Sequence, residues 1–563
     1  MQIPINKSTN LSQVFSARVS DTPDAPAYKQ FREDRWISYT WRETAHEVER
    51  WQAAMKADGL ATGDRVALCM RNRIEWVYFD QAALGLGLIP VPLYFDDRTD
   101  NMVWCMNDAG VKLLVLETDD IWPEISGEVE TLKRVVTLAT PTHSDEKLSG
   151  LGEWLPAVGG ELEQSDAIGD DMATIVYTSG TTGRPKGVML SHYNMLSNVD
   201  AGLRIVSVSA SDRFISFLPL SHMFERTVGC YIGIAAGAET VFARGITELG
   251  EDLQQQKPTI MVCVPRIFER INAKMQAGLP PNSLKRTLFE KAAEIGWKRF
   301  NHEAGLLDQL LWPVLKALVA SKIHARLGGR MRLIIVGAAA LSPELSKIFV
   351  GLGLPIIQGY GLTETSPIAC ANRLEDNDPA SVGRPLPDVE IELDGKGEIL
   401  IRGPLVMKGY WNNEAATKAV IDADGWFHSG DIGEFRDGRL YITGRAKEII
   451  VMSNGEKLPP GDVEQAIMMD PAFEQVMVVG EGRSKLGLLA VSEIRDEKEL
   501  CDRANMKLKK LPGWVQIHYL KRMSESWSVE NGFMTPTLKL KRAKIEKHWA
   551  KEIDEMYAGP YRA

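Results

Sequence analysis

The chain has 563 residues, of which 44% are hydrophobic and 25% charged, and its net charge is −10. This length exceeds what one ordinary hydrophobic core accommodates, so two or more domains are expected. The acidic excess argues against a nucleic-acid partner, because nucleic-acid-binding proteins usually carry a basic surplus. The six cysteines form no CxxC pair and no zinc spacing, which fits a reducing, cytoplasmic environment.

No secretory or membrane-spanning segment is expected. Residues 1–13 lack the apolar centre of a secretory signal, and no uninterrupted apolar run is long enough to cross a bilayer. Residues 306–327 alternate leucine, tryptophan and valine with lysine and arginine, which is typical of an amphipathic helix. Most such helices bury the apolar face in the protein and a minority lie on lipid, so peripheral contact with the inner membrane face stays open. The basic run 539–547 is also more often a solvated helix face than a docking patch.

Apolar runs alternate with helical patterns over about the first 440 residues, which indicates an α/β fold. Buried strands are expected at residues 65–70, 112–116, 134–138, 173–177, 259–264 and 332–336. Ser191 and Ser342 are good N-caps for helices that follow them. Near residue 437 the composition changes to a smaller unit of mixed elements, with a helix capped by Gly461 or Asp462 and a strand at 475–479.

Residues 177–188 read Tyr-Thr-Ser-Gly-Thr-Thr-Gly-Arg-Pro-Lys-Gly-Val. Glycines let the backbone approach a ligand and point N–H groups at it, while hydroxyls and cations suit phosphate oxygens. A polyphosphate-binding loop is therefore predicted, although many Gly/Ser/Thr-rich stretches are surface loops without a ligand. The order differs from the common P-loop, in which Gly-Lys is followed by Ser or Thr. The predicted phosphate-binding residues are Thr178, Ser179, Gly180, Thr181, Thr182, Gly183 and Lys186.

Two later segments add groups suited to a nucleotide. The strand at 331–336 leads into Gly337, Ala338 and Ala339, whose small side chains would let a flat purine approach; a tight strand-to-helix turn explains them as well. In the run 358–365, which holds Gln358, Gly359, Gly361 and Thr363, Tyr360 offers an aromatic face for a base, worth about 1–3 kcal/mol, and Glu364 offers a hard carboxylate suited to Mg²⁺.

Asp431 ends the run Gly-Trp-Phe-His-Ser-Gly-Asp, and its ionised carboxylate could accept both hydroxyls of a ribose. A hairpin with its turn at Asp437 and Gly438 would return Arg445 to the same place. A surface Asp or Arg is the ordinary alternative, which the paired spacing disfavours.

The run 177–188 resembles the phosphate loop of the adenylate-forming superfamily, which includes acyl-CoA synthetases, nonribosomal adenylation domains and beetle luciferases. The run 360–364 is similar to a second signature of that superfamily, tyrosine–glycine–x–threonine–glutamate. Two variants, at 218–226 and at 535–539, resemble those of long-chain acyl-CoA synthetases. In the second variant Leu538 stands where most of the superfamily has glycine, directly before the catalytic lysine.

The resemblance implies a large N-terminal domain, residues 1–445, of stacked sheets and helices with a distorted barrel. It also implies a mobile α+β C-terminal domain, residues 446–563, on a hinge at Lys447. Lys539 and Lys186 are the implied catalytic lysines, with Lys541 as the rival of Lys539, and His222 takes a positional role between the acyl and pantetheine paths.

The remaining implied ligands are Arg445 and Lys447 at the nucleotide, Thr178 and Glu364 at a magnesium ion, and Gly455 at the pantetheine tunnel. ATP, Mg²⁺ and CoA are the implied cofactors and co-substrates.

The implied activity is ATP-dependent ligation of a long-chain fatty acid to CoA through an acyl-adenylate. Separately, the small residues within 228–236 would leave room for an acyl chain, so we expect this region in the wall of an acyl tunnel. Loading of an acyl carrier protein is the nearest alternative. A light-emitting oxygenase is a distant one, and a silent fatty-acid-binding scaffold comes from a different class. The oligomeric state stays open, with a homodimer among the options.

Overall fold

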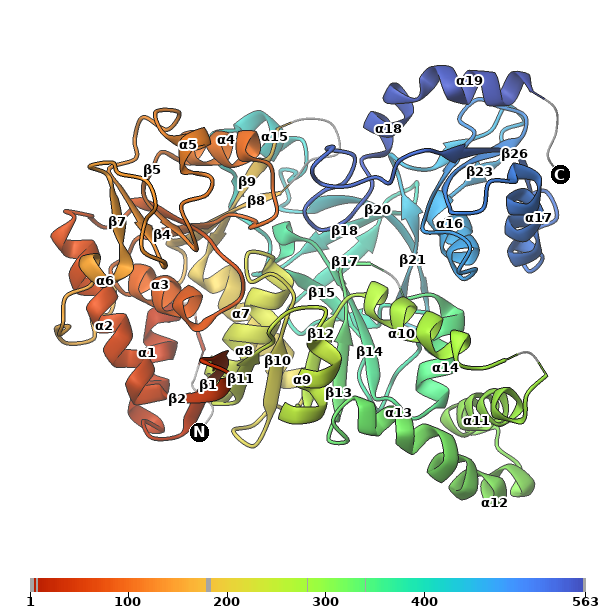
Figure 1. Ribbon diagram of the computed structural model, residues 1–563, viewed down its shortest axis with the longest axis horizontal. Helices are drawn as coiled ribbons and strands as arrows, with labels where there is room; N and C mark the ends of the chain where they lie inside the picture. The colour runs from red at the N-terminus through yellow and green to blue at the C-terminus, as the bar shows by residue number, and fades with distance from the viewer. Residues whose placement is uncertain (1–4, 7–8, 179–183, 281, 340, 560–563) are drawn as a thin grey trace.

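The computed structural model describes residues 5–6, 9–178, 184–280, 282–339 and 341–559. Figure 1 shows a large sheet-rich part built from the N-terminal portion of the chain and a smaller part built from its C-terminal end. The fold is α/β, as the sequence predicts.

The largest sheet has nine strands in the order β16-β15-β14-β13-β12-β10-β11-β1-β2. Neighbours from β14 to β1 run parallel, whereas β2, β15 and β16 pair antiparallel at the two edges. Its strands are β1 Pro26–Arg32, β2 Arg35–Thr40, β10 Arg213–Ser216, β11 Glu239–Phe242, β12 Ile260–Cys263, β13 Leu333–Val336, β14 Ile356–Gly361, β15 Ile368–Ala371 and β16 Arg384–Pro385.

A second sheet is parallel throughout and has the order β4-β3-β5-β6-β7. Its strands are β3 Arg65–Cys69, β4 Ile89–Pro92, β5 Val111–Leu116, β6 Arg134–Thr137 and β7 Leu148–Gly150. Two antiparallel sheets, β19-β9-β8 and β17-β18-β20-β21, complete this part of the molecule. They consist of β8 Met172–Thr178, β9 Lys186–Ser191, β17 Glu390–Leu393, β18 Glu398–Arg402, β19 Gly409–Tyr410, β20 Phe427–Arg436 and β21 Arg439–Arg445.

Helices surround these sheets (Figure 1). They are α1 Leu11–Asp21, α2 Trp41–Ala57, α3 Ile74–Gly85, α4 Thr99–Ala109, α5 Trp122–Ile125, α6 Leu151–Trp154, α7 His192–Ile205, α8 Ile232–Ala236, α9 Leu249–Gln256, α10 Pro265–Ala277, α11 Leu284–Phe300, α12 Leu306–Leu315, α13 Ser321–Arg326, α14 Pro343–Gly351 and α15 Glu414–Lys418. Two π-helical segments, η1 Glu225–Tyr231 and η2 Lys316–Ala320, and the short 3₁₀ turn η3 Thr363–Thr365 join them.

The C-terminal part has its own small sheet, β24-β25-β26, and a two-stranded ribbon, β22-β23. Its elements are β22 Ile450–Val451, β23 Lys457–Leu458, α16 Pro460–Met468, β24 Gln475–Val479, β25 Leu486–Val491, α17 Glu497–Leu508, β26 Ile517–Met523, α18 Arg542–His548 and α19 Ala550–Ala558. The two buried clusters that fill this part draw all their members from residues 450–557.

All six expected buried strands form, as β3, β5, β6, β8, β12 and β13. Ser191 caps α7 by accepting a hydrogen bond from the Asn194 amide, and Ser342 caps α14 through the Leu345 amide, so both expected caps are confirmed. The expected cap at Gly461 or Asp462 is wrong, because α16 begins earlier. Pro460 occupies its first position, where the fixed φ of proline suits a helix and its missing N–H costs nothing.

The amphipathic segment at 306–327 is helical without a break from Leu306 to Arg326, as expected, with a π-helical stretch in its middle. It comprises α12, the π-helical η2 and α13, and Pro313 lies inside α12. Much of its apolar surface faces outward rather than into the protein. No helix within the described residues combines the length and apolarity needed to span a membrane.

A buried ion pair joins the π-helical segment η1, helix α3 and strand β8. The guanidinium of Arg226, in η1, donates to the Asp80 carboxylate of α3 and, at 2.9 Å, to the Thr174 hydroxyl of β8. Tyr231 donates its hydroxyl to the other Asp80 oxygen at 2.6 Å. Arg226 and Asp80 are 0% and 1% exposed, so each charge depends on the other for compensation.

Arg226→Ala should therefore lower the free energy of unfolding by roughly 3–5 kcal/mol, because it strands the buried Asp80 charge. Arg204→Ala is the matched control, since Arg204 pairs with Asp388 on the surface and should cost less than about 1 kcal/mol. Denaturant unfolding of both variants measures the difference. Equal losses would contradict a central role for the buried pair.

Candidate active site

A cavity of about 340 Å³ lies where the ends of β8, β9 and β14 meet residues 535–541 of the C-terminal part. It gathers groups from both parts of the molecule. The sequence-predicted residues that line it are Thr178, Lys186, His222, Gly337, Ala338, Gly359, Tyr360, Gly361, Thr363, Glu364, Arg445, Lys447 and Lys539. Lys541 lines it as well.

The glycine-rich loop connects two antiparallel strands, whereas a P-loop connects a strand to a helix. Thr178 at the end of β8 pairs directly with Lys186 at the start of β9, so both side chains belong to the mouth of one hairpin. Gly187 allows close packing there, because a Cβ at this position would lie 2.8 Å from the Ile175 side chain. The predicted phosphate-binding residues Ser179, Gly180, Thr181, Thr182 and Gly183 lie outside the described residues.

Tyr410 is a cavity residue that the sequence analysis missed. Its hydroxyl donates to Glu364 Oε1 at 2.8 Å, and the Lys186 Nζ lies 4.9 Å from the centre of its ring. It is held by β19, which pairs antiparallel with β9 of the hairpin. Tyr410 thus connects the predicted metal-binding carboxylate to the predicted phosphate-binding lysine. No motif marks it in the sequence, because the link depends on a strand pairing over more than 200 residues.

Asp431, Arg445 and Tyr360 form a second connected group. The expected hairpin is confirmed as β20 and β21, and its register pairs Asp431 directly with Arg445. The Asp431 carboxylate accepts from the Tyr360 hydroxyl and from Arg445 Nε, each at 2.8 Å. Asp431 is buried behind Tyr360 and Arg445, and only these two of the three line the cavity.

Besides Asp431, three more predicted residues lie outside the cavity lining: Gln358, Ala339 and Gly455. The buried Gln358 amide accepts from the Leu341 amide and donates to the Pro379 carbonyl, so it braces the turn that carries Gly337 and Ala338. Ala339 is exposed beyond that turn. Gly455 lies on the exposed turn between β22 and β23, with a left-handed φ of +85° that favours glycine.

A tight turn presents Lys539 to the cavity. The Lys539 amide donates to the Thr535 hydroxyl at 3.0 Å, and the Thr535 amide donates to the Lys539 carbonyl at 2.9 Å. Leu538 adopts a left-handed φ of +59°, which costs a branched residue roughly 1–2 kcal/mol. That conformation explains physically why glycine suits this position in the resembling sequences.

Both cationic and anionic side chains lie near the Lys539 ammonium. The Lys539 side chain reaches solvent through the cavity, yet the surrounding protein and then Arg445 lower its pKa, while Asp431, Glu448 and Glu364 oppose that shift. An ammonium so placed is less well solvated than in water, so an anion entering the cavity would gain more from it.

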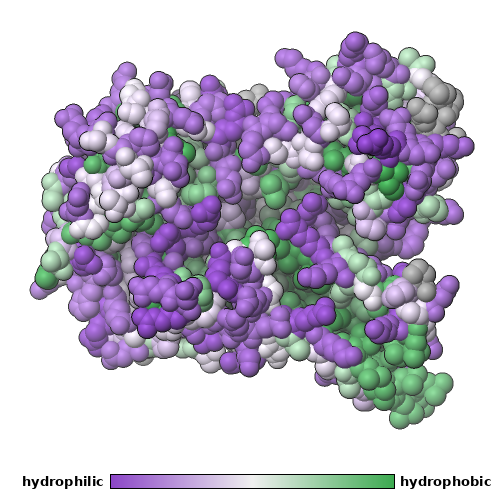
Figure 2. Space-filling model, viewed as in Figure 1, coloured by the Kyte–Doolittle hydropathy of each residue, from purple (hydrophilic) through white to green (hydrophobic). Residues whose placement is uncertain are grey.

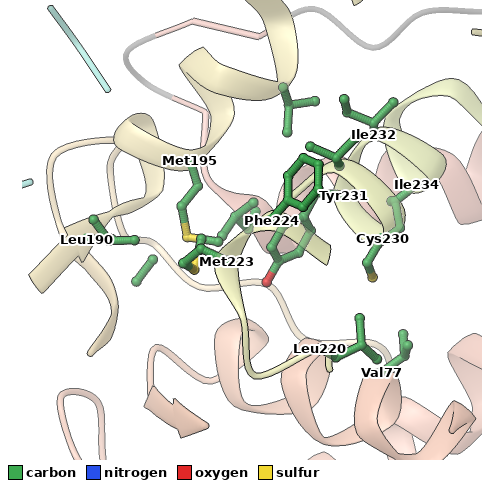
Figure 3. Close-up of a cluster of buried hydrophobic side chains, with 14 of the residues drawn as sticks. Val77, Leu190, Met195, Leu220, Met223, Phe224, Cys230, Tyr231, Ile232 and Ile234 are labelled. Carbon is green, nitrogen blue, oxygen red and sulfur yellow. The ribbon is translucent and has the colours of Figure 1, made fainter. Parts of the chain in front are cut away.

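His222 and Phe224 form another part of the cavity wall. Burial, with a smaller effect of Lys539, lowers the pKa of His222 to about 4, so its imidazole is neutral near pH 7. Its Nδ1 accepts from the Phe224 amide at 3.2 Å, which leaves the proton on Nε2. Phe224 also belongs to the large buried apolar cluster, beside Met195, Met223 and Tyr231 (Figure 3).

Glu225 follows Phe224 in the chain and does not line the cavity. It is 0% exposed, and neither carboxylate oxygen has a hydrogen-bond partner among the residues that the structure describes. Burial raises its pKa to about 8; the Ser216 hydroxyl opposes this shift without making a well-formed hydrogen bond. Glu225 is therefore a neutral acid at pH 7.

Groups able to hold a magnesium ion are present but incomplete by themselves. Glu364 and Thr178 supply oxygen donors of the kind Mg²⁺ prefers. No cluster of three or more His, Cys, Asp or Glu side chains occurs in the described part of the chain. The donor set fits an ion that takes its remaining ligands from phosphates and water.

The AMP-binding enzyme family matches residues 15–411, and the AMP-binding enzyme C-terminal domain matches residues 447–560. The chain therefore belongs to the AMP-binding enzyme family, which confirms the resemblance to adenylate-forming enzymes.

Named relatives match over nearly the whole chain. It is 30% identical to the long-chain-fatty-acid–CoA ligase FadD15 of Mycobacterium bovis, covering 98% of each protein. It is 27% identical to AEE15, a chloroplastic long-chain-fatty-acid–[acyl-carrier-protein] ligase of Arabidopsis thaliana, covering 93% of this chain and 83% of that protein. The fold matches the crystal structure of the anthranilate CoA ligase AuaEII in complex with anthranoyl-AMP, with a TM-score of 0.77, 20% identity and coverage of 98% and 99%.

Replacing the buried acid should change how stability depends on pH. The folded-state pKa of Glu225, about 8, lies above its ordinary value of 4.5, so folding binds a proton and stability falls as pH rises between these values. Glu225→Gln cannot ionise and so removes this pH-dependent loss of stability. At pH 7 its free energy of unfolding should exceed that of the wild type by roughly 3 kcal/mol.

The measurement is the difference in unfolding temperature between variant and wild type from pH 5 to pH 8. Glu414→Gln, at an exposed position, controls for the loss of one surface charge. A difference for Glu225→Gln that does not change with pH would refute a neutral buried acid.

Removing the Tyr410 hydroxyl should leave the Glu364 carboxylate free to move, because it takes away a hydrogen bond that positions it. One lost hydrogen bond to a carboxylate corresponds to roughly 1.5–3 kcal/mol, so Tyr410→Phe should weaken Mg²⁺-dependent ATP binding by about 10- to 100-fold. Calorimetric titration with and without Mg²⁺ measures it. Tyr557→Phe, whose hydroxyl bonds the Val479 carbonyl within the C-terminal part, is the control that should bind normally.

Proposed function

We propose that this chain is an ATP-dependent long-chain fatty acid–CoA ligase. A fatty-acid carboxylate attacks the α-phosphate of ATP, giving an acyl-adenylate and pyrophosphate; the CoA thiol then displaces AMP and gives the acyl-CoA. The proposal rests above all on the cavity lined by Thr178, Lys186, Glu364 and Lys539, which combines the groups that bind phosphate and Mg²⁺.

The first step requires two anions to approach each other. Like charges 4 Å apart repel by about 4 kcal/mol at an effective dielectric of 20. Lys186 and Lys539 would offset this repulsion and stabilise the charge that develops on the departing pyrophosphate. Glu364 and Thr178 would hold a magnesium ion, which neutralises phosphate charge when bound.

The remaining cavity groups would orient the nucleotide. We assign the base to the face of Tyr360 and to the turn of Gly337, Ala338 and Ala339, with Gln358 acting through that turn and Gly359, Gly361 and Thr363 completing the wall. We assign the ribose to Asp431, with Arg445 and Lys447 beside it. The phosphates would lie on the loop from Thr178 to Lys186, including Ser179, Gly180, Thr181, Thr182 and Gly183.

The second step requires space that Lys539 occupies. We propose that residues 446–563 turn about Lys447 against residues 1–445, which withdraws Lys539 and brings Gly455 to a pantetheine path past His222. In support, Lys539 lines the cavity whereas Gly455 lies on an exposed turn outside it, and one loop cannot fill the site while a thiol enters it.

A long acyl chain is the favoured substrate. The named relative FadD15 is a long-chain-fatty-acid–CoA ligase, and the runs 218–226 and 535–539 resemble the long-chain variants. Phe224 joins the cavity to the apolar cluster, and each methylene buried beyond it would contribute about 0.8 kcal/mol. Most residues of the expected tunnel wall at 228–236 belong to that cluster. None of the described residues that line the cavity lies between 228 and 236.

Acyl carrier protein is the alternative thiol acceptor, because the relative AEE15 is named as a ligase for that carrier. Parallel assays with CoA and with a phosphopantetheinylated carrier protein distinguish the two. A panel of fatty acids from short to long then defines the chain length. We place the enzyme in the cytoplasm, with peripheral membrane contact as described below.

Lys539→Ala should lower ATP–pyrophosphate exchange by at least about 100-fold, because it removes transition-state charge stabilisation. Thioester formation from a preformed acyl-adenylate should continue. Lys541→Ala is the matched control from the same cavity rim and should retain most of the exchange activity. If Lys541→Ala abolished exchange and Lys539→Ala did not, the two assignments would have to be reversed.

A further inference from the structure

The helix α12 carries a row of large apolar side chains into solvent. Spaced one, three or four residues apart along α12 and η2, they form what we call the α12 stripe: Leu306, Leu307, Leu310, Leu311, Val314 and Leu318. Leu306 is 82% exposed and Leu310 74% exposed. Single exposed leucines are ordinary on protein surfaces, but a contiguous apolar patch marks a site of interaction.

The segment that carries the stripe is already packed against the protein on its other face. The opposite face of the same segment packs inward, where Leu315 is buried and Trp312 contacts the cluster that α11 forms with Leu352. Arg299 of α11 lies over the Trp312 ring at 5.6 Å and helps to fix the helix. The segment is thus anchored on one side and apolar on the other.

The stripe lies on a projection of the molecule rather than in a groove. Figure 2 shows the apolar side chains gathered at the end of an arm in the region of α11, α12 and α13, at the lower right. A convex apolar surface of this kind has no cavity that would receive a helix or a peptide. It fits a flat or deformable apolar phase.

The arm has the charge that an acidic lipid surface attracts. Residues 284–330 contain nine lysines and arginines against four acidic residues, a net charge of +5 in a chain whose total is −10. Lys316 lies between the last two stripe residues, Lys322 and Arg326 follow the stripe, and all three are exposed. Each basic residue near an anionic bilayer contributes about 1 kcal/mol to binding, a term that salt screens.

We propose that the α12 stripe docks the protein on the surface of an anionic phospholipid bilayer. The leucines would enter the boundary between headgroups and acyl chains, and the arm's cations would contact the lipid phosphates. The segment would lie in this boundary without spanning the membrane, because its inner face packs against α11 and no helix within the described residues is long and apolar enough to cross.

A second copy of the chain is a less suitable occupant. A symmetric contact between two stripes would bring two arms of charge +5 together, which electrostatic repulsion disfavours. Docking does not depend on the proposed ligase activity, since no stripe residue lines the cavity. It would nevertheless place the enzyme where long-chain fatty acids partition.

The test is co-sedimentation of the full chain with vesicles of phosphatidylcholine alone or mixed with phosphatidylglycerol, at low and high salt. The wild type should bind the mixed vesicles, more weakly at high salt. Leu307→Ser with Leu310→Ser should reduce the bound fraction at least tenfold. Val158→Ser with Ile168→Ser, a pair of exposed aliphatic residues outside the arm, is the matched control and should bind like the wild type.

A second variant separates the two contributions. Lys316→Gln with Lys322→Gln should weaken binding and flatten its salt dependence while leaving the stripe intact. Unfolding temperatures and activity on a water-soluble short acid should match the wild type in every variant. Equal vesicle binding by the stripe variant, or no binding by the wild type, would overturn the proposal. A wild-type dimer in lipid-free ultracentrifugation that the stripe variant abolishes would overturn it in favour of self-association.

Discussion

The buried ion pair between Asp80 and Arg226 is the constraint on which the site's architecture depends. It ties α3, η1 and, through Thr174, strand β8 into one unit. The same strand ends at Thr178, and the segment just before Arg226 carries His222 and Phe224 to the cavity. A pair so fully desolvated tolerates few displacements, because moving either partner exposes a buried charge to an apolar medium. The hairpin mouth and the histidine wall therefore keep a fixed relation to each other.

Around this fixed unit the protein arranges charges that would repel one another without a substrate. Arg445, Lys186 and Lys539 line one cavity, and the carboxylates that balance them are engaged by Tyr410 and Tyr360. Burial by the surrounding protein and, after it, the charge of Arg445 lower the pKa of Lys539, so an anion bound nearby would stabilise the ammonium. A polyphosphate would relieve this repulsion and so stabilise the arrangement in which Lys539 lines the cavity. Such a dependence suits an enzyme that must open for a second substrate.

Two features lie outside this charged cavity, and each sets a polar environment against an apolar one. Glu225 is kept neutral by burial next to the wall that Phe224 closes, so the apolar cluster contains an acid without containing a charge. The α12 stripe is the reverse case, an apolar surface kept in water beside a cationic arm. Each lowers the stability of the isolated protein, and a contiguous exposed apolar surface such as the α12 stripe marks a site of interaction.

The sequence by itself determined the family, the class of fold and most of the candidate site, since the motifs at 177–188, 360–364, 431–445 and 535–539 each carry their chemistry locally. Buried strands such as 332–336 and caps such as Ser191 followed from local patterns as well. Tertiary structure alone decided that Tyr410 joins Glu364 to Lys186 and that Gln358 and Asp431 lie behind the cavity wall, because these contacts join residues that are separated in the chain. It also decided which way the 306–327 segment faces: an amphipathic pattern fixes that one side is apolar, but only the neighbouring elements determine whether anything covers it.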